Sequence, residues 1–357
     1  MKKGISTRCV HAGEEPEPRT GAVGTPVFEN TTFLYPNPEP NAIQGERVGD
    51  YYIYTRYNNP TVEALEAKVT DLEDGGGAVA FSSGMAAIST TLLTLAGEGG
   101  HVVSARDLYG GTYTLMRDLL PKLGVEVTFV DTRDTDGFWS AIRDDTRLIY
   151  CESITNPVLK VADIPELAEI AHGKDIPLVV DATFATPINQ NPLEQGADVV
   201  VHSCTKYLGG HGDVTGGIAV ASDEVAHDIR DRMIFYGGCI DPMAAWLVIR
   251  GLKTLELRVA RQNATARWLG DWLEGNEKVV SVLHPELESH PDHEVAQRVL
   301  RAGGGMVTFE LADLDACHRC LDAFETITVA SSLGSVDSLV SLPVETSHWE
   351  LDAAERA

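Results

Sequence analysis

A lysine near the middle of the chain has neighbours suited to covalent chemistry. Lys206 follows the hydroxyl side chains Ser203 and Thr205 and precedes a glycine-rich turn, and upstream the apolar run at 178–180 ends on Asp181. A lysine amine can form a Schiff base with an aldehyde, hydroxyls can bind a phosphate, and a carboxylate can keep a pyridine nitrogen protonated. Pyridoxal 5'-phosphate (PLP) requires these groups of a protein. Taken singly, they would be a solvated lysine and a turn aspartate.

A second segment could bind a phosphate from another side. Ser83, Gly84 and Met85 follow a short apolar run and open a helical pattern. Backbone N–H groups at a helix N-terminus attract anions, and glycine lets a backbone approach closely. On its own this segment would be an ordinary strand–helix turn, but beside the lysine segment it predicts a phosphate site built from two parts.

The lysine segment also resembles that of a known family. Residues 203–211 resemble the lysine motif of the Cys/Met-metabolism PLP-dependent enzymes, which include cystathionine γ-synthase, cystathionine γ-lyase, methionine γ-lyase and O-acylhomoserine sulfhydrylase. Further stretches match in the family's order, at 54–61, 82–87, 108–113, 152–157 and 331–334. The resemblance extends from about residue 5 to the last residue. It implies an α/β fold, fold type I of the PLP-dependent transferases, with a smaller α+β C-terminal domain.

The resemblance implies a role for each matching residue. Lys206 would anchor PLP and then act as the base at the substrate Cα, Asp181 would face the pyridine nitrogen, and Tyr109 would stack on the ring and exchange a proton near the leaving group. Asn156 would reach the 3-oxygen of the cofactor and the substrate carboxylate, and Ser332 would lie near that carboxylate. The implied cofactor-binding residues are Tyr54, Arg56, Ser83, Gly84, Met85, Tyr109, Asn156, Asp181, Ser203, Thr205 and Lys206.

Two of these residues imply an oligomer. By the resemblance, Tyr54 and Arg56 complete the phosphate site from a neighbouring subunit, and an arginine fork suits a phosphate because it can bind two oxygens at once. We therefore expect a homodimer with shared active sites that assembles further into a tetramer.

Three positions depart from the family's usual residues. Position 182 is Ala where Asn is usual, but the adjacent carboxylate of Asp181 is intact. Position 331 is Ser where many cystathionine-specific members carry Glu, which argues against cystathionine. Position 111 is Gly where bacterial methionine γ-lyases usually carry Cys, which argues against methionine. The expected reaction is therefore γ-elimination or γ-replacement at a C–S or C–O bond, of the cystathionine γ-lyase or γ-synthase type. Methionine γ-lyase and O-acylhomoserine sulfhydrylase are the alternatives.

The chain is also shorter than the family pattern. In the family, a strand and helix follow the position of Arg356 and carry the arginine that binds the substrate carboxylate, and no residue of this sequence matches that arginine. Two further hypotheses therefore stand beside the enzyme: a cofactor-binding but inactive protein, and a structural partner in a heteromeric assembly.

Composition narrows the class of protein. The formal net charge is −25, with 53 acidic against 28 basic residues, which argues against nucleic acid and anionic membranes as partners. Such acidity fits a saline cytoplasm or an ordinary acidic enzyme equally well. No apolar run approaches a membrane span and no signal peptide is evident, so we expect a cytoplasmic protein with reduced thiols. Cys317 and Cys320 have zinc-like spacing but lack a second pair of ligands, so no metal is expected.

The periodicity of the chain predicts the elements that position these residues. Apolar runs at 78–81, 101–104, 125–130, 148–151, 178–180, 199–201 and 218–220 alternate with helical patterns such as 85–95, 112–123 and 164–172. This alternation predicts a mostly parallel sheet with helices on both faces, and no strand is followed by the glycine fingerprint of a nicotinamide site. A helical pattern at 242–274 leads to strands near 279–283 and 305–311 and a helix near 314–324. We predict an extended arm at 1–55, a PLP-binding domain at 56–240 and a smaller domain at 241–357.

Overall fold

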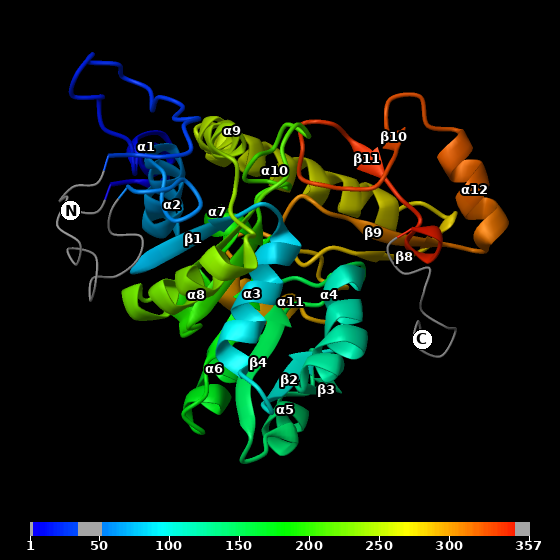
Figure 1. The fold of residues 1–357 in the computed structure, drawn as a ribbon. Coiled ribbons are helices and arrows are strands. Elements are labelled where there is room, and N and C mark those ends of the chain that lie inside the picture. The colour runs from blue at the N-terminus through cyan, green and yellow to red at the C-terminus, as the bar shows by residue number, and fades with distance from the viewer. Residues whose placement is uncertain (1–2, 35–51, 347–357) are drawn as a thin grey trace.

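A seven-stranded sheet forms the centre of the computed structural model, which describes residues 3–34 and 52–346 (Figure 1). The strand order is β1-β7-β6-β5-β4-β2-β3, and every strand runs parallel to the others except β7, which is antiparallel to both of its neighbours. The strands are β1 (Gly77–Phe81), β2 (His101–Ala105), β3 (Glu126–Val130), β4 (Thr146–Glu152), β5 (Leu178–Asp181), β6 (Val199–Ser203) and β7 (Gly217–Ala221). The predicted mostly parallel sheet is confirmed.

Helices cover both faces of this sheet because successive strand residues point to opposite sides. On β1, Ala78 and Ala80 pack in the same apolar cluster as helices α2 (Pro60–Glu73) and α9 (Pro242–Leu252). Val79 and Phe81 pack in the other cluster, with α3 (Gly84–Ala96) and α8 (Asp223–Tyr236). Burial on both sides explains why the central strands read as continuous apolar runs.

The remaining elements are shorter or lie after the sheet. The helices are α1 (Ile5–His11), α4 (Gly110–Thr114), α5 (Thr135–Ala141), α6 (Ile164–His172), α7 (Thr186–Asn189), α10 (Leu255–Glu274), α11 (His293–Val299) and α12 (Leu314–Asp322). Two strand pairs lie outside the central sheet: the antiparallel pair β8 (Val279–Leu283) and β9 (Thr308–Leu311), and the short parallel pair β10 (Thr328–Val329) and β11 (Leu339–Val340). In Figure 1 β10, β11 and α12 lie at the side of the molecule opposite to α1 and α2. None of the described helices has the length and apolar character needed to cross a bilayer.

The N-terminal arm contains a helix that the sequence does not predict. Helix α1 is fastened to α2 by Arg8, which bonds Asp71 and Asp74 at 2.8 Å each. A helix of seven residues is too short to show a clear periodicity in the sequence, which is why the segment reads as extended.

The long helical pattern at 242–274 forms two helices rather than one. Helix α9 ends at Leu252 and α10 begins at Leu255. The carbonyl of Gly251 accepts from Thr254 N at 3.1 Å and from Arg258 Nη2 at 2.9 Å, so it is not available to continue a regular helix. Gly251 also packs against Gly209, where a Cβ atom would lie only 2.2 Å from the carbonyl oxygen.

The pattern at 112–123 is helical but irregular. Helix α4 passes into a wide π-type turn at Leu115–Leu119 and then a 3-10 turn at Leu120–Leu123. Pro121 has no N–H and its ring crowds the preceding turn, which disfavours a regular α-helix here.

Candidate active site

Polar side chains gather at one edge of the sheet. Because β1, β2, β4, β5 and β6 are parallel, their carboxyl ends share this edge, which is where open α/β sheets bind ligands. Asp181 and Glu152 are the last residues of β5 and β4 and lie opposite each other in register. Ser203 is the last residue of β6, and Lys206 follows it in a turn closed by a hydrogen bond from Lys206 N to Ser203 O at 3.1 Å.

Lys206 has no carboxylate partner among the described ion pairs. Its side-chain nitrogen donates to Ser332 Oγ at 2.9 Å. Burial disfavours the charged ammonium and so lowers the pKa of Lys206. The arrangement provides an amine that gives up its proton more readily than an exposed lysine, as both a covalent anchor and a base require.

Asp181 is a buried carboxylate with no ion-pair partner among the residues that the structure describes. Its Oδ1 accepts from Thr183 N at 2.9 Å, and none of the described ion pairs includes it. Burial raises the pKa of Asp181, while hydrogen bonds from Thr183 and the charge of His202 lower it. A protonated pyridine nitrogen would supply a positively charged partner for this carboxylate, so this position fits the ring of PLP.

The phosphate segments are in direct contact. The hydroxyl of Ser83 caps α3 by accepting from Ala86 N at 3.1 Å. A Cβ atom on Gly84 would lie 2.9 Å from Cβ of Ser203, and one on Gly217 would lie 2.2 Å from the carbonyl oxygen of Ser83. Only glycine permits this approach, which brings the N-terminus of α3 to the lysine turn. These residues fit a phosphate group.

Thr205 stabilises the same turn. Its hydroxyl accepts from Gly216 N at 3.1 Å and lies 3.3 Å from Gly216 O. Residue 216 immediately precedes β7, so this contact joins the lysine turn to the start of the antiparallel strand.

The side chain of Glu152 accepts hydrogen bonds from the backbone of both Tyr109 and Asn156. The backbone N–H of Tyr109 donates to Glu152 Oε1 at 2.6 Å, and that of Asn156 donates to Oε2 at 3.3 Å. The ring of Tyr109 is half exposed and lies beside Gly111, where a Cβ atom would lie 2.6 Å from Tyr109 Cε1 and 3.3 Å from Met85 Sδ. Tyr109 and Met85 therefore face each other across Gly111.

The structure brings most of the predicted residues to this one edge. Through the contacts above, it connects Ser83, Gly84, Met85, Tyr109, Asn156, Asp181, Ser203, Thr205, Lys206 and Ser332.

Tyr54 and Arg56 lie elsewhere in this chain. Arg56 Nη1 donates to the carbonyl of Ile234 in the last turn of α8 at 2.6 Å, and its guanidinium lies over the rings of Tyr57 and Tyr54 at 5.0 Å and 5.6 Å. No hydrogen bond or ion pair of the described residues joins Arg56 to Lys206 or Ser203. Within a single chain these two residues are thus not part of the lysine cluster.

Glu152 receives no role from the sequence alone. It ends an apolar run, as Asp181 does, and two such acids on neighbouring parallel strands are a signal of a polar sheet edge. The sequence does not show that β4 and β5 are adjacent, and this pairing is what places the two carboxylates together.

This chain is similar to known proteins over nearly its whole length. The family described as Cys/Met metabolism PLP-dependent enzyme matches residues 6–357. The cystathionine gamma-lyase of Bacillus subtilis is 42% identical over 100% of this chain and 91% of its own length. The cystathionine beta-lyase of Coxiella burnetii is also 42% identical, over 99% of this chain and 90% of its own length. The crystal structure of metB from Corynebacterium glutamicum superposes with a TM-score of 0.94 at 38% identity, covering 99% of this chain and 90% of that one.

Proposed function

The chain belongs to the family of Cys/Met metabolism PLP-dependent enzymes, and we propose that it acts at the γ-carbon of a sulfur amino acid or an activated homoserine. It is an enzyme of sulfur amino acid metabolism with a fold type I architecture, and its cofactor is PLP. The observation that carries the proposal is Lys206, a half-buried amine that pairs with no carboxylate of the described residues. It is turned toward Ser332 at the edge that also holds Asp181.

The roles proposed for the residues follow from their surroundings. When bound, PLP supplies an electron sink for negative charge that develops at the substrate Cα. Lys206 anchors the cofactor and receives the Cα proton, a role that suits an amine whose pKa is lowered by burial. Asp181 holds a proton at the ring nitrogen. Tyr109 exchanges a proton near the leaving group, and Asn156 and Ser332 orient the amino acid substrate.

The proposed phosphate site uses both segments and a second copy of the chain. The N-terminus of α3 with Ser83, Gly84 and Met85, and the hydroxyls of Ser203 and Thr205, bind the phosphate from one subunit. Tyr54 and Arg56 are supplied by the neighbouring subunit, a role supported by their position at the end of α8 rather than in the lysine cluster of their own chain. A homodimer, assembled into a tetramer, is the form in which the site is complete.

We also propose the division into 1–55, 56–240 and 241–357, and a cytoplasmic location. All six cysteines are free, as a reducing compartment would keep them.

The surroundings of Gly111 favour cystathionine or an activated homoserine over methionine. A side chain at position 111 would occupy space filled by the ring of Tyr109, so the cysteine usual in bacterial methionine γ-lyases would displace that ring. Cleavage at the β-carbon is the second candidate, because a relative at 42% identity carries the name cystathionine beta-lyase.

Product analysis tests the proposal. Purified protein loaded with PLP is incubated with cystathionine, with methionine, and with O-acetylhomoserine plus cysteine. Cleavage of cystathionine at the γ-carbon gives cysteine, 2-oxobutyrate and ammonia, whereas cleavage at the β-carbon gives homocysteine, pyruvate and ammonia. We expect 2-oxobutyrate from cystathionine or cystathionine from the last mixture, and pyruvate as the main product would refute a γ-carbon enzyme.

A further inference from the structure

Glu152 is a buried carboxylate that makes one contact to each of two loops. It ends β4 and is 5% exposed. The loop after β2 donates Tyr109 N to Oε1 at 2.6 Å, and the loop after β4 donates Asn156 N to Oε2 at 3.3 Å. None of the described ion pairs gives Glu152 a cation.

The geometry of these contacts demands a carboxylate of this length. Both oxygens accept, so a glutamine could satisfy only one N–H and would turn its own NH₂ group toward the other. A buried acid beside Asp181 is costly, because burial and the neighbouring charge both raise the pKa of Glu152, whereas the two N–H groups lower it. A purely structural position would be filled at less cost by a neutral residue.

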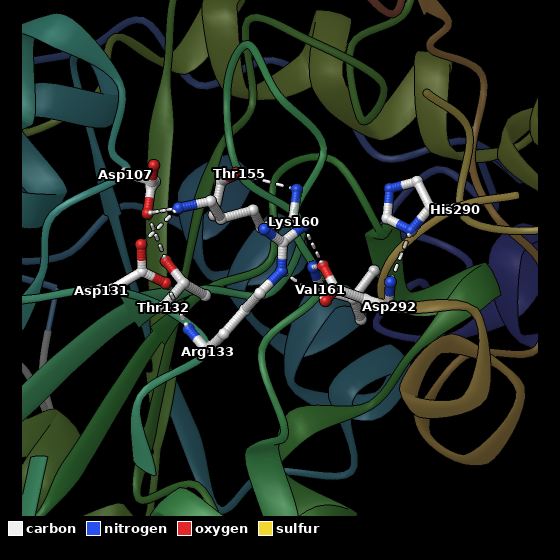
Figure 2. A network of polar contacts seen from close by, with 9 residues as sticks. All are labelled: Asp107, Asp131, Thr132, Arg133, Thr155, Lys160, Val161, His290 and Asp292. Carbon is white, nitrogen blue, oxygen red and sulfur yellow. Dashed lines mark hydrogen bonds and ion pairs between the residues drawn. The ribbon is translucent and has the colours of Figure 1, made fainter. Parts of the chain in front are cut away.

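The same two loops meet at a second point. Figure 2 shows Lys160 directed at Asp107 and Asp131, with its nitrogen 2.8 Å and 2.7 Å from their carboxylates. Asp107 lies two positions before Tyr109, and Lys160 lies four positions after Asn156. Thr132 also donates to Asp107 at 3.0 Å, so the loops after β2, β3 and β4 are joined around the site.

We propose that Glu152 is a positioning residue, which fixes Tyr109 and Asn156 relative to each other by holding both backbone N–H groups. The inference rests on the proposed function, which assigns Tyr109 to proton exchange and Asn156 to the substrate. Misplacement of reacting groups by a fraction of an ångström lowers the rate of a step without abolishing binding.

Hydrogen exchange of the cofactor-free protein tests the contacts without activity. In Glu152→Gln, amides in peptides containing Tyr109 and Asn156 are expected to exchange about ten-fold faster, because one N–H loses its acceptor. Glu66→Gln is the matched control: Glu66 is a buried carboxylate that accepts from Ala80 N at 2.8 Å and pairs with Arg230 at 2.6 Å, remote from Tyr109 in the fold. It should speed exchange at β1 alone.

Kinetics then separate positioning from stability. Glu152→Gln should lower kcat by about ten- to a hundred-fold, as one lost hydrogen bond to a charged group would, and Glu66→Gln should leave kcat within about two-fold. In a Tyr109→Phe background Glu152→Gln should cost clearly less, since both changes affect one tyrosine. Fully additive losses, or unchanged exchange and kcat in Glu152→Gln, would overturn the inference.

Two further measurements keep the outcomes distinct. If Glu152→Gln does not fold, Glu152→Asp retains the charge but lacks one methylene, and amides in peptides containing Tyr109 and Asn156 should exchange faster than in the wild type. Wild-type exchange in Glu152→Asp would overturn the inference. Borohydride reduction of the PLP-loaded enzyme reports on the proposed function separately. If the reduced cofactor is found on Lys206 but Glu152→Gln changes neither amide exchange nor kcat, only the role of Glu152 is refuted. If no reduced cofactor is found on Lys206, the proposed site itself is refuted.

Discussion

The side-chain nitrogen of Lys206 lies 2.9 Å from the hydroxyl oxygen of Ser332, although 126 residues separate the two. Ser332 adopts a φ of 90°, a left-handed conformation that is strained for any residue with a side chain. Two residues later Gly334 packs on the backbone of Tyr207, where a Cβ atom would lie 2.7 Å from the nitrogen. The loop at 332–334 therefore packs closely against the lysine turn, and the strained backbone of Ser332 places its hydroxyl within hydrogen-bond distance of the Lys206 amine.

Ser332→Ala and Ser332→Gly should separate the hydroxyl from the strain. Both remove the acceptor for Lys206 and should lower kcat/KM by about ten-fold, the size of one hydrogen bond to a charged group. Only glycine relieves the positive φ, so Ser332→Gly should be more stable than Ser332→Ala by about 1 kcal/mol in urea unfolding. Equal stability of the two variants would show that the loop is not strained, and unchanged kcat/KM would show that the hydroxyl has no part in catalysis.

Asp181→Asn should retain PLP but turn over slowly. A neutral amide cannot hold the proton at the ring nitrogen, and the loss of one charge-assisted hydrogen bond predicts a fall in kcat of about ten- to a hundred-fold. The same change removes a buried charge next to Glu152, so the cofactor-free variant should be more stable than the wild type. Cofactor content, kcat and urea unfolding check the prediction. Near-normal turnover would exclude Asp181 as the partner of the ring nitrogen.

Much of the fold could be predicted because the strands of the central sheet are buried on both faces and read as short apolar runs. The runs at 178–180 and 199–201 correspond to β5 and β6, which end on Asp181 and Ser203. A strand that must end on a polar residue at the sheet edge gives a clear signal in the sequence.

The sequence could not show features that depend on contacts between distant segments. The break between α9 and α10 lies where Gly251 packs against Gly209 of the lysine turn, and this contact appears in no local pattern. The role proposed for Glu152 depends on the pairing of β4 with β5 and on two backbone N–H groups from separate loops. Strand order and loop geometry are tertiary properties, so both were available only from the structure.

Arg56→Ala and Lys206→Ala should complement each other if active sites are shared between subunits. Each variant alone should be nearly inactive, because Arg56→Ala lacks a phosphate contact and Lys206→Ala lacks the anchor. In mixed dimers one of the two sites contains neither change, so activity should return toward a quarter of the wild-type value at equal mixing. Exchange of subunits is verified by native mass spectrometry with one isotopically labelled variant. If exchange occurs and activity does not return, Arg56 acts within its own chain.

The paired carboxylates Glu152 and Asp181 should make the cofactor-free protein lose stability as pH rises. Burial and mutual repulsion raise the pKa of Glu152, and burial raises that of Asp181, above the values near 4 that carboxyls have in an unfolded chain. Between the unfolded and the folded values, the folded protein binds more protons, so stability falls as pH increases through that window. Below this window both carboxyls are protonated in the folded and in the unfolded state, so they do not change the stability with pH. The other ionisable groups facing the pair are Tyr150, Cys151, Asp107 and His202.

The measurement must isolate the effect of Glu152 and Asp181, because buried histidines change the stability with pH in the opposite direction. Burial lowers the pKa of His101, His284 and His290, so their contribution makes the protein more stable as pH rises. Urea unfolding of the cofactor-free wild type and Glu152→Gln at several values between about pH 5 and pH 8 removes this background when one curve is subtracted from the other. The free energy of unfolding of Glu152→Gln should rise relative to that of the wild type as pH increases. Bound PLP should reduce this rise, because a ring cation beside Asp181 offsets the repulsion between the two carboxylates. A difference independent of pH would mean that the pKa of Glu152 is not raised in the folded protein.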